Sequence, residues 1–104
     1  MEVRGPAGMA DDAMMEEGRP RLRAKARMRY DTVRQSFVLL LPERAVLLSE
    51  SAAEILQLCD GNRTAAGVIQ VLQERYHDAD VPGDVREFLQ QAARKGWIEW
   101  MASA

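Results

Sequence analysis

The first regular pattern along the chain is an alternation of apolar and polar residues. Residues 26–31 (ARMRYD) place apolar side chains at every second position, which is typical of a strand with one buried face. Turn-prone polar residues occupy 31–36, and an unbroken apolar run follows at 37–41. Pro42 and Glu43 suit a tight turn because proline presets its φ angle, and an apolar segment resumes at 45–48. The pattern predicts three antiparallel strands in meander order.

The second predicted strand does not alternate. Phe37 to Leu41 are all apolar, whereas a sheet that is covered on one side should have polar residues at every second position. Either both faces of the sheet are covered, or one face presents an apolar surface to a partner or to a second copy of the chain. The residues alone do not choose between these alternatives.

Three helices are predicted after the strands. Residues that start and stop helices flank each one: a capping box of Ser51 and Glu54, then Asp60-Gly61; Thr64, then Tyr76; Pro82 with Asp84, then Gly96. Each stretch also has the i, i+3, i+4, i+7 spacing of a buried stripe: Ala52, Ile55, Leu56 and Cys59; Ala65, Val68, Ile69, Leu72 and Tyr76; Val85, Phe88, Leu89 and Ala92.

An apolar tail ends the chain. We expect Trp97 and Ile98 to close the core, whereas the pattern does not place Trp100. The order of elements predicts an α+β domain, a three-stranded antiparallel sheet followed by a three-helix bundle, which resembles a winged helix-turn-helix module with its strands first. Residues 1–18 lack a sustained period and are predicted to be a disordered leader, so the domain comprises residues 19–104.

Charge is distributed unevenly along the 104 residues, whose net charge is -2. Residues 1–18 hold one basic and five acidic residues, residues 19–29 hold six basic and no acidic ones, and the remainder is acidic. The alternating run RPRLRAKARMRYD suggests an arm that tracks phosphates, but nucleic-acid-binding domains usually carry their basic surface on the folded part. We therefore predict that Met28 and Tyr30 face inward in the first strand, and that the first half of the run is an exposed approach to it.

A search for catalytic or metal-binding residues finds little. The single histidine, His77, lies in a predicted loop without a nucleophile motif, and the single cysteine, Cys59, is expected to be a small buried residue that suits a reducing cytoplasm. Asp78 and Asp80 imitate the start of a calcium loop, but Leu89 stands where that loop needs a bidentate glutamate. We predict no catalytic residue, metal or cofactor. No apolar stretch approaches the roughly 20 residues that span a bilayer, so we expect a cytoplasmic protein without a membrane partner.

The most distinctive local sequence is Asp60-Gly61-Asn62-Arg63-Thr64. It has a complete structural interpretation as a helix stop, a glycine with positive φ and a helix cap. Arg63 is not explained by that interpretation, and it could pair with an acid or meet a partner.

A recognition surface is the remaining possibility. The third predicted strand, Ala45 to Leu48, is short and apolar and is followed directly by helices, so it is a candidate for the edge of the sheet. An extended peptide can add to such an edge through its main chain while its alternate side chains enter pockets. The apolar strands are also compatible with a monomer or a weak homodimer.

The segment from Arg19 to Trp100 resembles the PqqD family, small proteins of pyrroloquinoline quinone (PQQ) biosynthesis. The resemblance rests on the order and spacing of three stretches, RPRLRAKARMRYD, VLLLPERAVLLSESAAEILQLCDGNRT and VPGDVREFLQQAARKGWI. It implies a peptide chaperone rather than an enzyme. Proteins of this family bind the ribosomal precursor peptide PqqA and present it to PqqE, a radical S-adenosylmethionine enzyme that cross-links a glutamate and a tyrosine of the peptide.

The resemblance also implies where the peptide binds, because related peptide-recognition domains place it against the third strand and the third helix. Carried onto this chain, the implied peptide-binding residues are Ala45, Val46, Leu47, Leu48, Val85, Arg86, Phe88, Leu89 and Gln90. Periodicity also assigns Val85, Phe88 and Leu89 to the core, so they could instead form the floor of a groove.

The principal alternative is a DNA-binding winged helix protein that uses the second helix as reader and the basic run as arm. The reader would offer Gln70, Gln73 and Arg75 to DNA, while Glu74 would oppose phosphate. One basic residue is few for such a helix, and we predict no nucleic-acid partner.

Overall fold

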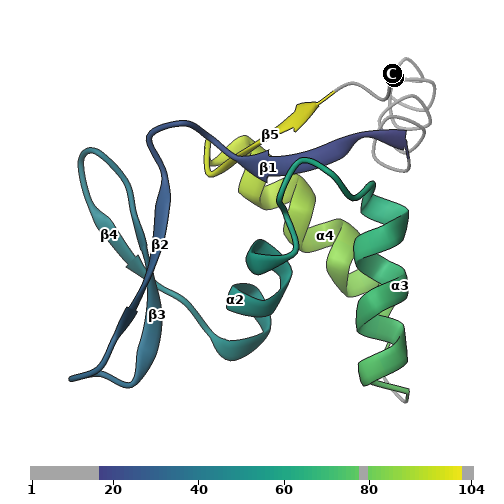
Figure 1. The fold of residues 1–104 in the computed structure, drawn as a ribbon, viewed down its shortest axis with the longest axis horizontal. Coiled ribbons are helices and arrows are strands. Elements are labelled where there is room, and N and C mark those ends of the chain that lie inside the picture. Colours follow the sequence, from purple (N-terminus) through teal and green to yellow (C-terminus); the bar gives the residue numbers. More distant parts are fainter. Residues whose placement is uncertain (1–16, 78–79, 102–104) are drawn as a thin grey trace, which may run out of the picture.

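The computed structural model describes residues 17–77 and 80–101 (Figure 1). Three strands precede three helices, as predicted: β2 (Arg27–Asp31), β3 (Ser36–Leu40), β4 (Ala45–Leu47), α2 (Glu50–Gln57), α3 (Ala65–Arg75) and α4 (Val81–Arg94). The strands form an antiparallel meander in the order β2-β3-β4. The predicted α+β class and the order of its elements are confirmed. The likeness to a winged helix stays a prediction.

A second, two-stranded sheet was not predicted. β1 (Arg19–Leu22) pairs antiparallel with β5 (Ile98–Met101), with Pro20 opposite Trp100. Pro20 is fully buried, so the prediction that the first half of the basic run is only an exposed approach is wrong. The run forms a strand because the chain places the apolar tail beside it, and this contact between distant residues leaves no local periodic signal.

The core lies between the β2–β3–β4 sheet, the helices and the β1–β5 sheet. α2 packs against β3, α3 against α4, and α4 against β5. Trp97 and Ile98 are buried as expected, and Trp100 is half-buried against the same core. The most deeply buried large side chains come from both sheets and all three helices: Leu39, Leu56, Val68, Leu89 and Ile98.

The structure confirms the predicted cap of α3 and corrects that of α2. Thr64 caps α3 as predicted, because its Oγ1 accepts a hydrogen bond from the Gly67 N–H at 3.1 Å. The capping box at Ser51 is wrong: Ser49 has the extended backbone of a cap, and its Oγ accepts from the Ala52 N–H at 3.2 Å. Ser51 lies one residue inside α2, where its own backbone is helical. Three-residue spacing of serine and glutamate therefore did not identify the first residue of the helix.

Tyr30 and Tyr76 are both more exposed than predicted. Tyr30 lies on the inner side of its strand, stacked edge-on against Phe37 at 5.1 Å between ring centroids, yet it is 49% exposed. Tyr76, predicted to end the buried stripe of α3, is 46% exposed. Both residues lie where their elements extend beyond the packed core. No helix among the described residues has the length and hydrophobicity that a membrane span requires.

Candidate functional site

The candidate site is centred on β4, which forms one edge of the meander sheet. Its only strand partner among the described residues is β3. Leu41 and Arg44 exchange both backbone hydrogen bonds at the turn before β4, at 2.8 and 3.3 Å. After β4, the Leu48 N–H donates to the Phe37 oxygen at 3.0 Å. These bonds determine which residues of β4 are hydrogen-bonded to β3.

This alternating hydrogen-bond pattern decides which backbone groups of β4 are available to a ligand. Residues of an antiparallel pair alternate between those that bond to the partner strand and those that point away from it. Because Arg44 and Leu48 bond to β3, Val46 between them does so too, opposite Leu39. The N–H and C=O groups of Ala45 and Leu47 therefore point to the open edge. They are the groups that an added strand would pair with.

The sheet has a second edge, β2, whose chemistry differs from that of β4. By the same alternation, Met28 and Tyr30 point their backbone groups away from β3. This strand carries Arg27 and Arg29, and charged side chains on an edge strand discourage the addition of another strand. β4 has the sequence Ala-Val-Leu and carries no charge. Of the two edges, β4 is therefore the one whose composition opposes the addition of a strand less.

The four strand residues implied by the family resemblance lie on two faces. Val46 is half-buried against the core, and Leu48, just after the strand, is buried. Ala45 and Leu47 face the other side, and Leu47 is 57% exposed. The apolar surface that the unbroken run predicted as one of two alternatives is therefore present, on the side of the sheet away from the helices.

The implied residues on α4 differ in accessibility. Val85 and Leu89 are 2% and 0% exposed, so they belong to the core, as their periodicity predicted. Arg86, Phe88 and Gln90 are half-buried. The Phe88 ring lies 6.4 Å from that of Trp97, between ring centroids. Contact of these α4 residues with a peptide stays a prediction. Of these, only the half-buried Arg86, Phe88 and Gln90 are accessible to a ligand.

Three surface hollows border these elements. The first, of about 580 Å³, lies on the side of the sheet away from the helices and is lined by Arg29, Tyr30, Asp31, Thr32, Val33, Arg34, Val38, Leu40, Ala45 and Leu47. The second, of about 390 Å³, lies between the meander and α2 and is lined by Tyr30, Gln35, Ser36, Phe37, Leu48, Ser49, Glu50, Ala53, Glu54, Gln57 and Tyr76. The third, of about 240 Å³, is lined by Ser51, Glu54, Ile55, Leu72, Tyr76, Val81, Asp84 and Val85. Ala45 and Leu47 thus line the first hollow and Leu48 the second, whereas Val85 of α4 lines the third.

A polar cluster between α2 and α3 was missed in the sequence. The Glu54 carboxylate accepts a hydrogen bond from the Tyr76 hydroxyl at 2.6 Å and from Arg75 Nη1 at 3.1 Å. The hydrogen bond to Glu54 raises the pKa of Tyr76, because the carboxylate favours the protonated phenol. These residues lie more than 20 positions apart, and only the assembled helices bring them together.

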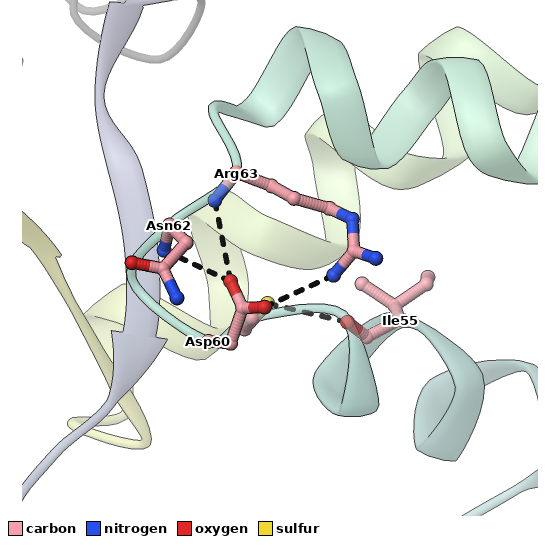
Figure 2. A network of polar contacts seen from close by, with 5 residues as sticks. Ile55, Asp60, Asn62 and Arg63 are labelled. Carbon is pink, nitrogen blue, oxygen red and sulfur yellow. Dashed lines mark hydrogen bonds and ion pairs between the residues drawn. The ribbon is translucent and has the colours of Figure 1, made fainter.

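The loop that follows α2 is a structural element, as its sequence predicted (Figure 2). Asp60 Oδ1 accepts hydrogen bonds from the backbone N–H groups of Asn62 and Arg63, at 2.9 and 3.2 Å. Arg63 Nη1 reaches Asp60 Oδ2 at 3.0 Å, so the arginine pairs with an acid within its own loop. Those N–H donors and the positive charge of Arg63 lower the pKa of Asp60.

The same loop holds β1 in place. The Gly61 N–H donates to the Pro20 oxygen and the Ala65 N–H to the Gly18 oxygen, each at 3.0 Å. Gly61 has a φ of +81°, which glycine adopts without strain. This loop therefore covers the edge of β1 that β5 leaves open.

The described residues include few groups that could act as a nucleophile or bind a metal ion. Cys59 is buried, its thiol donates to the Ile55 oxygen at 3.2 Å (Figure 2), and burial together with the Asp60 charge raises its pKa to about 12. A thiol in that state is a poor nucleophile at neutral pH. No group of three or more His, Cys, Asp or Glu residues in the described ranges could hold a metal ion. Asp80 caps α4, while Asp78 lies outside the described residues.

Comparisons with known proteins agree with this arrangement. The sequence profile described as Coenzyme PQQ synthesis protein D (PqqD) matches residues 36–98. A protein of Rhodopseudomonas palustris named PqqA binding protein is 41% identical over 88 residues, which cover 83% of this chain and 86% of the relative. A protein of the same name from Methylococcus capsulatus is 39% identical over 72 residues, 69% of this chain and 77% of the relative.

A solved structure has the same fold. It is the solution NMR structure of the PqqD part of Methylobacterium extorquens PqqCD, described as a functional, stand-alone recognition element for ribosomally synthesized and post-translationally modified peptides. It superposes with a TM-score of 0.64 and 38% identity, covering 77% of this chain and 87% of the other. The matched profile spans more than half of the chain, and the similar proteins extend the match toward the N-terminus. This chain belongs to the PqqD family.

Proposed function

We propose that this protein binds the precursor peptide PqqA in PQQ biosynthesis by adding a strand of the peptide to β4, and presents the bound peptide to PqqE. Its relatives are named PqqA binding proteins. The observation that carries the binding mode is the uncharged edge of β4, whose outward backbone groups belong to Ala45 and Leu47. The proposal gives the chain a binding role and leaves the cross-linking of glutamate and tyrosine to PqqE.

Backbone hydrogen bonds supply the affinity in this binding mode, and side chains supply the selectivity. A peptide strand beside β4 places alternate side chains on the two faces of the sheet. On the helix side we expect them to meet the half-buried Val46 and, as the family resemblance implies, the half-buried Phe88 and Gln90 of α4. We therefore expect a PqqA segment with apolar side chains at every second position to occupy the edge.

The binding mode is tested by removing one outward N–H group. Leu47→Pro removes the N–H that points to the open edge and leaves the bonds of Val46 to β3 in place, and proline is tolerated on edge strands. Leu47→Ala is the matched control, because it shortens the same side chain and keeps the N–H. We expect Leu47→Pro to weaken PqqA binding about tenfold in calorimetry, because one strand hydrogen bond is lost and a peptide carbonyl is left without its donor, and Leu47→Ala to weaken it far less.

Wild-type affinity in Leu47→Pro, with the fold intact by NMR, would contradict strand addition at β4. The presentation step has its own measurement: PqqE turnover of PqqA should rise with added wild-type protein and not with Leu47→Pro. If both proteins stimulated PqqE equally, presentation would not depend on peptide binding at this edge.

The DNA-binding alternative receives no support from the geometry of α3. Arg75, the basic residue of the supposed reader helix, is engaged with Glu54 at 3.1 Å. A reader helix needs side chains that are available to base edges and phosphates.

A further inference from the structure

The side of the β2–β3–β4 sheet away from the helices has an unusual composition. We call it the outer face; it consists of Val38 and Leu40 of β3 with Ala45 and Leu47 of β4, of Arg27 and Arg29 of β2, and of Asp31 and Ser36, which pair at one end of the sheet, where Asp31 is engaged with Arg34. A sheet with one solvated face normally carries polar residues there. On β3 and β4 these four outward positions are apolar, and the hollow of about 580 Å³ lies over them. An apolar surface of this kind marks an interaction site.

The outer face is open to solvent in the described part of the chain. Figure 1 shows the three helices on the opposite side of the sheet. Leu47 is 57% exposed, Ala45 is exposed, and Val38 and Leu40 are only half-buried. One more exposed apolar side chain, that of Val33, lines the same hollow. This concentration sets the outer face apart from scattered surface apolar residues, which need no explanation.

Two arginines border the apolar columns on one side. Arg27 is paired with Leu40 across the strands and Arg29 with Val38, so both guanidinium groups project from the same face. Within residues 17–77 and 80–101 neither side chain has a hydrogen bond or an ion pair, whereas Arg34 nearby is engaged with Asp31 at 3.5 Å. The outer face therefore presents two apolar columns and, about 5 Å away at the strand spacing, one column of unpaired positive charge.

We propose that the outer face docks an acidic amphipathic helix of a second protein. A helix suits this face, because helices pack onto sheet faces in layered domains and an apolar stripe about 100° wide matches two strands of apolar residues, while its polar flank can carry the charges that meet the arginines. The stripe would rest on Val38, Leu40 and Leu47. Glutamate or aspartate residues along one flank of the helix would then lie over Arg27 and Arg29. The partner helix must therefore be acidic, and its acidic flank must face β2.

This docking surface is separate from the proposed peptide site. A peptide added to β4 uses the edge of the sheet, that is, the outward N–H and C=O groups of Ala45 and Leu47. The helix uses the side chains of the outer face and none of these backbone groups. The inference therefore does not rest on the proposed function, although a strand added at β4 would place some of its side chains beside the docked helix.

The test uses two designed 18-residue peptides and the full chain labelled with ¹⁵N. The first peptide is an amphipathic helix with a leucine stripe and a glutamate flank, and the second has lysine in place of every glutamate. We expect the acidic peptide to shift the amides of Arg29, Val38, Leu40 and Leu47, and the lysine peptide to bind at least about tenfold more weakly because it repels the arginines. Arg27→Glu with Arg29→Glu should reverse the preference between the two peptides.

Three further variants complete the experiment. Leu47→Ser should weaken the acidic peptide severalfold, Arg27→Lys with Arg29→Lys should preserve most of its affinity, and Arg94→Glu, a reversal at the far end of α4, should leave it unchanged. Equal binding of both peptides, or shifts confined to α2 and α3, would overturn the proposal. So would stronger shifts of the same amides by a 12-base-pair DNA duplex, or a dimer in sedimentation that Leu47→Ser converts to monomer, because nucleic acid or a second copy would then be the occupant.

Discussion

The two sheets of this protein differ in whether their edges and faces are covered by other parts of the chain. β1 is enclosed: β5 pairs with one edge, and the loop after α2 contacts the other through the Gly61 N–H. Its exposed charge is paired as well, because Arg21 Nε lies 2.8 Å from the Glu99 carboxylate. Among the described residues, the β2–β3–β4 sheet has two open edges and an apolar outer face. One sheet closes the fold, and the other is available for binding.

The difference shows how a small domain can hold both stability and recognition. Unpaired strand edges and exposed apolar faces invite association, so proteins cover them unless they use them. Here the β1–β5 sheet joins the ends of the described chain, with Pro20 and Ile98 fully buried. The open sheet is anchored by the inner side alone, through residues such as Leu39. Substitutions should therefore separate the two roles.

The largest expected effect comes from the core beneath the closed sheet. Ile98→Ala removes a side chain that is 1% exposed and should lower the free energy of unfolding by about 2–5 kcal/mol, because it leaves a cavity. Leu47→Ala, on the outer face, should cost less than about 1 kcal/mol because that side chain is 57% exposed. Urea denaturation of both variants measures the contrast. Equal losses would mean that the outer face contributes to stability as the closed sheet does.

A second, smaller effect tests the loop that encloses β1. Gly61→Ala should lower the free energy of unfolding by about 1–2 kcal/mol, because alanine is strained at a φ of +81° and its Cβ would lie 3.4 Å from the Arg21 Cβ. Gly67→Ala is the matched control: this glycine is helical, and an added Cβ would make ordinary contacts at 3.6 Å. It should be neutral or stabilising by up to about 1 kcal/mol. Thermal unfolding that ranks the two in the reverse order would contradict the role given to this loop.

The smallest effect concerns the carboxylate of that loop. The folded structure lowers the pKa of Asp60, so its contribution to stability is present above the unfolded pKa, about 3.9, and is lost as the pH falls through the lower folded pKa. Asp60→Asn keeps an oxygen for the two N–H donors and removes the charge. Its stability should therefore fall less than that of the wild type between pH 5 and about pH 2. Identical acid denaturation curves would show that the Arg63 pair and the charge contribute nothing measurable.

Local patterns in the sequence predicted much of the fold. The alternation before Tyr30, the apolar run at 37–41 and three helical stripes correspond to β2, β3 and the three helices. Thr64 was found as a cap because its signal is local. Ser51 was predicted as a cap because Glu54 follows it three residues later, and that spacing does not reveal the backbone conformation that makes Ser49 the cap.

Contacts between distant residues could not be predicted in this way. β1 and β5 pair Arg19 with Met101, at opposite ends of the described chain, and each strand alone is too short to show a period. The strand edge at Ala45 was predicted from its place before the helices. The register with β3 decides which of its backbone groups face outward, and local sequence patterns do not reveal that register.

The central claim is that a peptide strand adds to β4 and not to β2. Hydrogen exchange of the complex with PqqA, followed residue by residue by NMR, tests it most directly, because an amide that gains a strand hydrogen bond exchanges more slowly. Strand addition at β4 predicts new protection at the outward amides of Leu47 and Ala45, and no change at Met28 and Tyr30 on the other edge. Protection at Met28 and Tyr30, or binding of PqqA without protection at either edge, would contradict it.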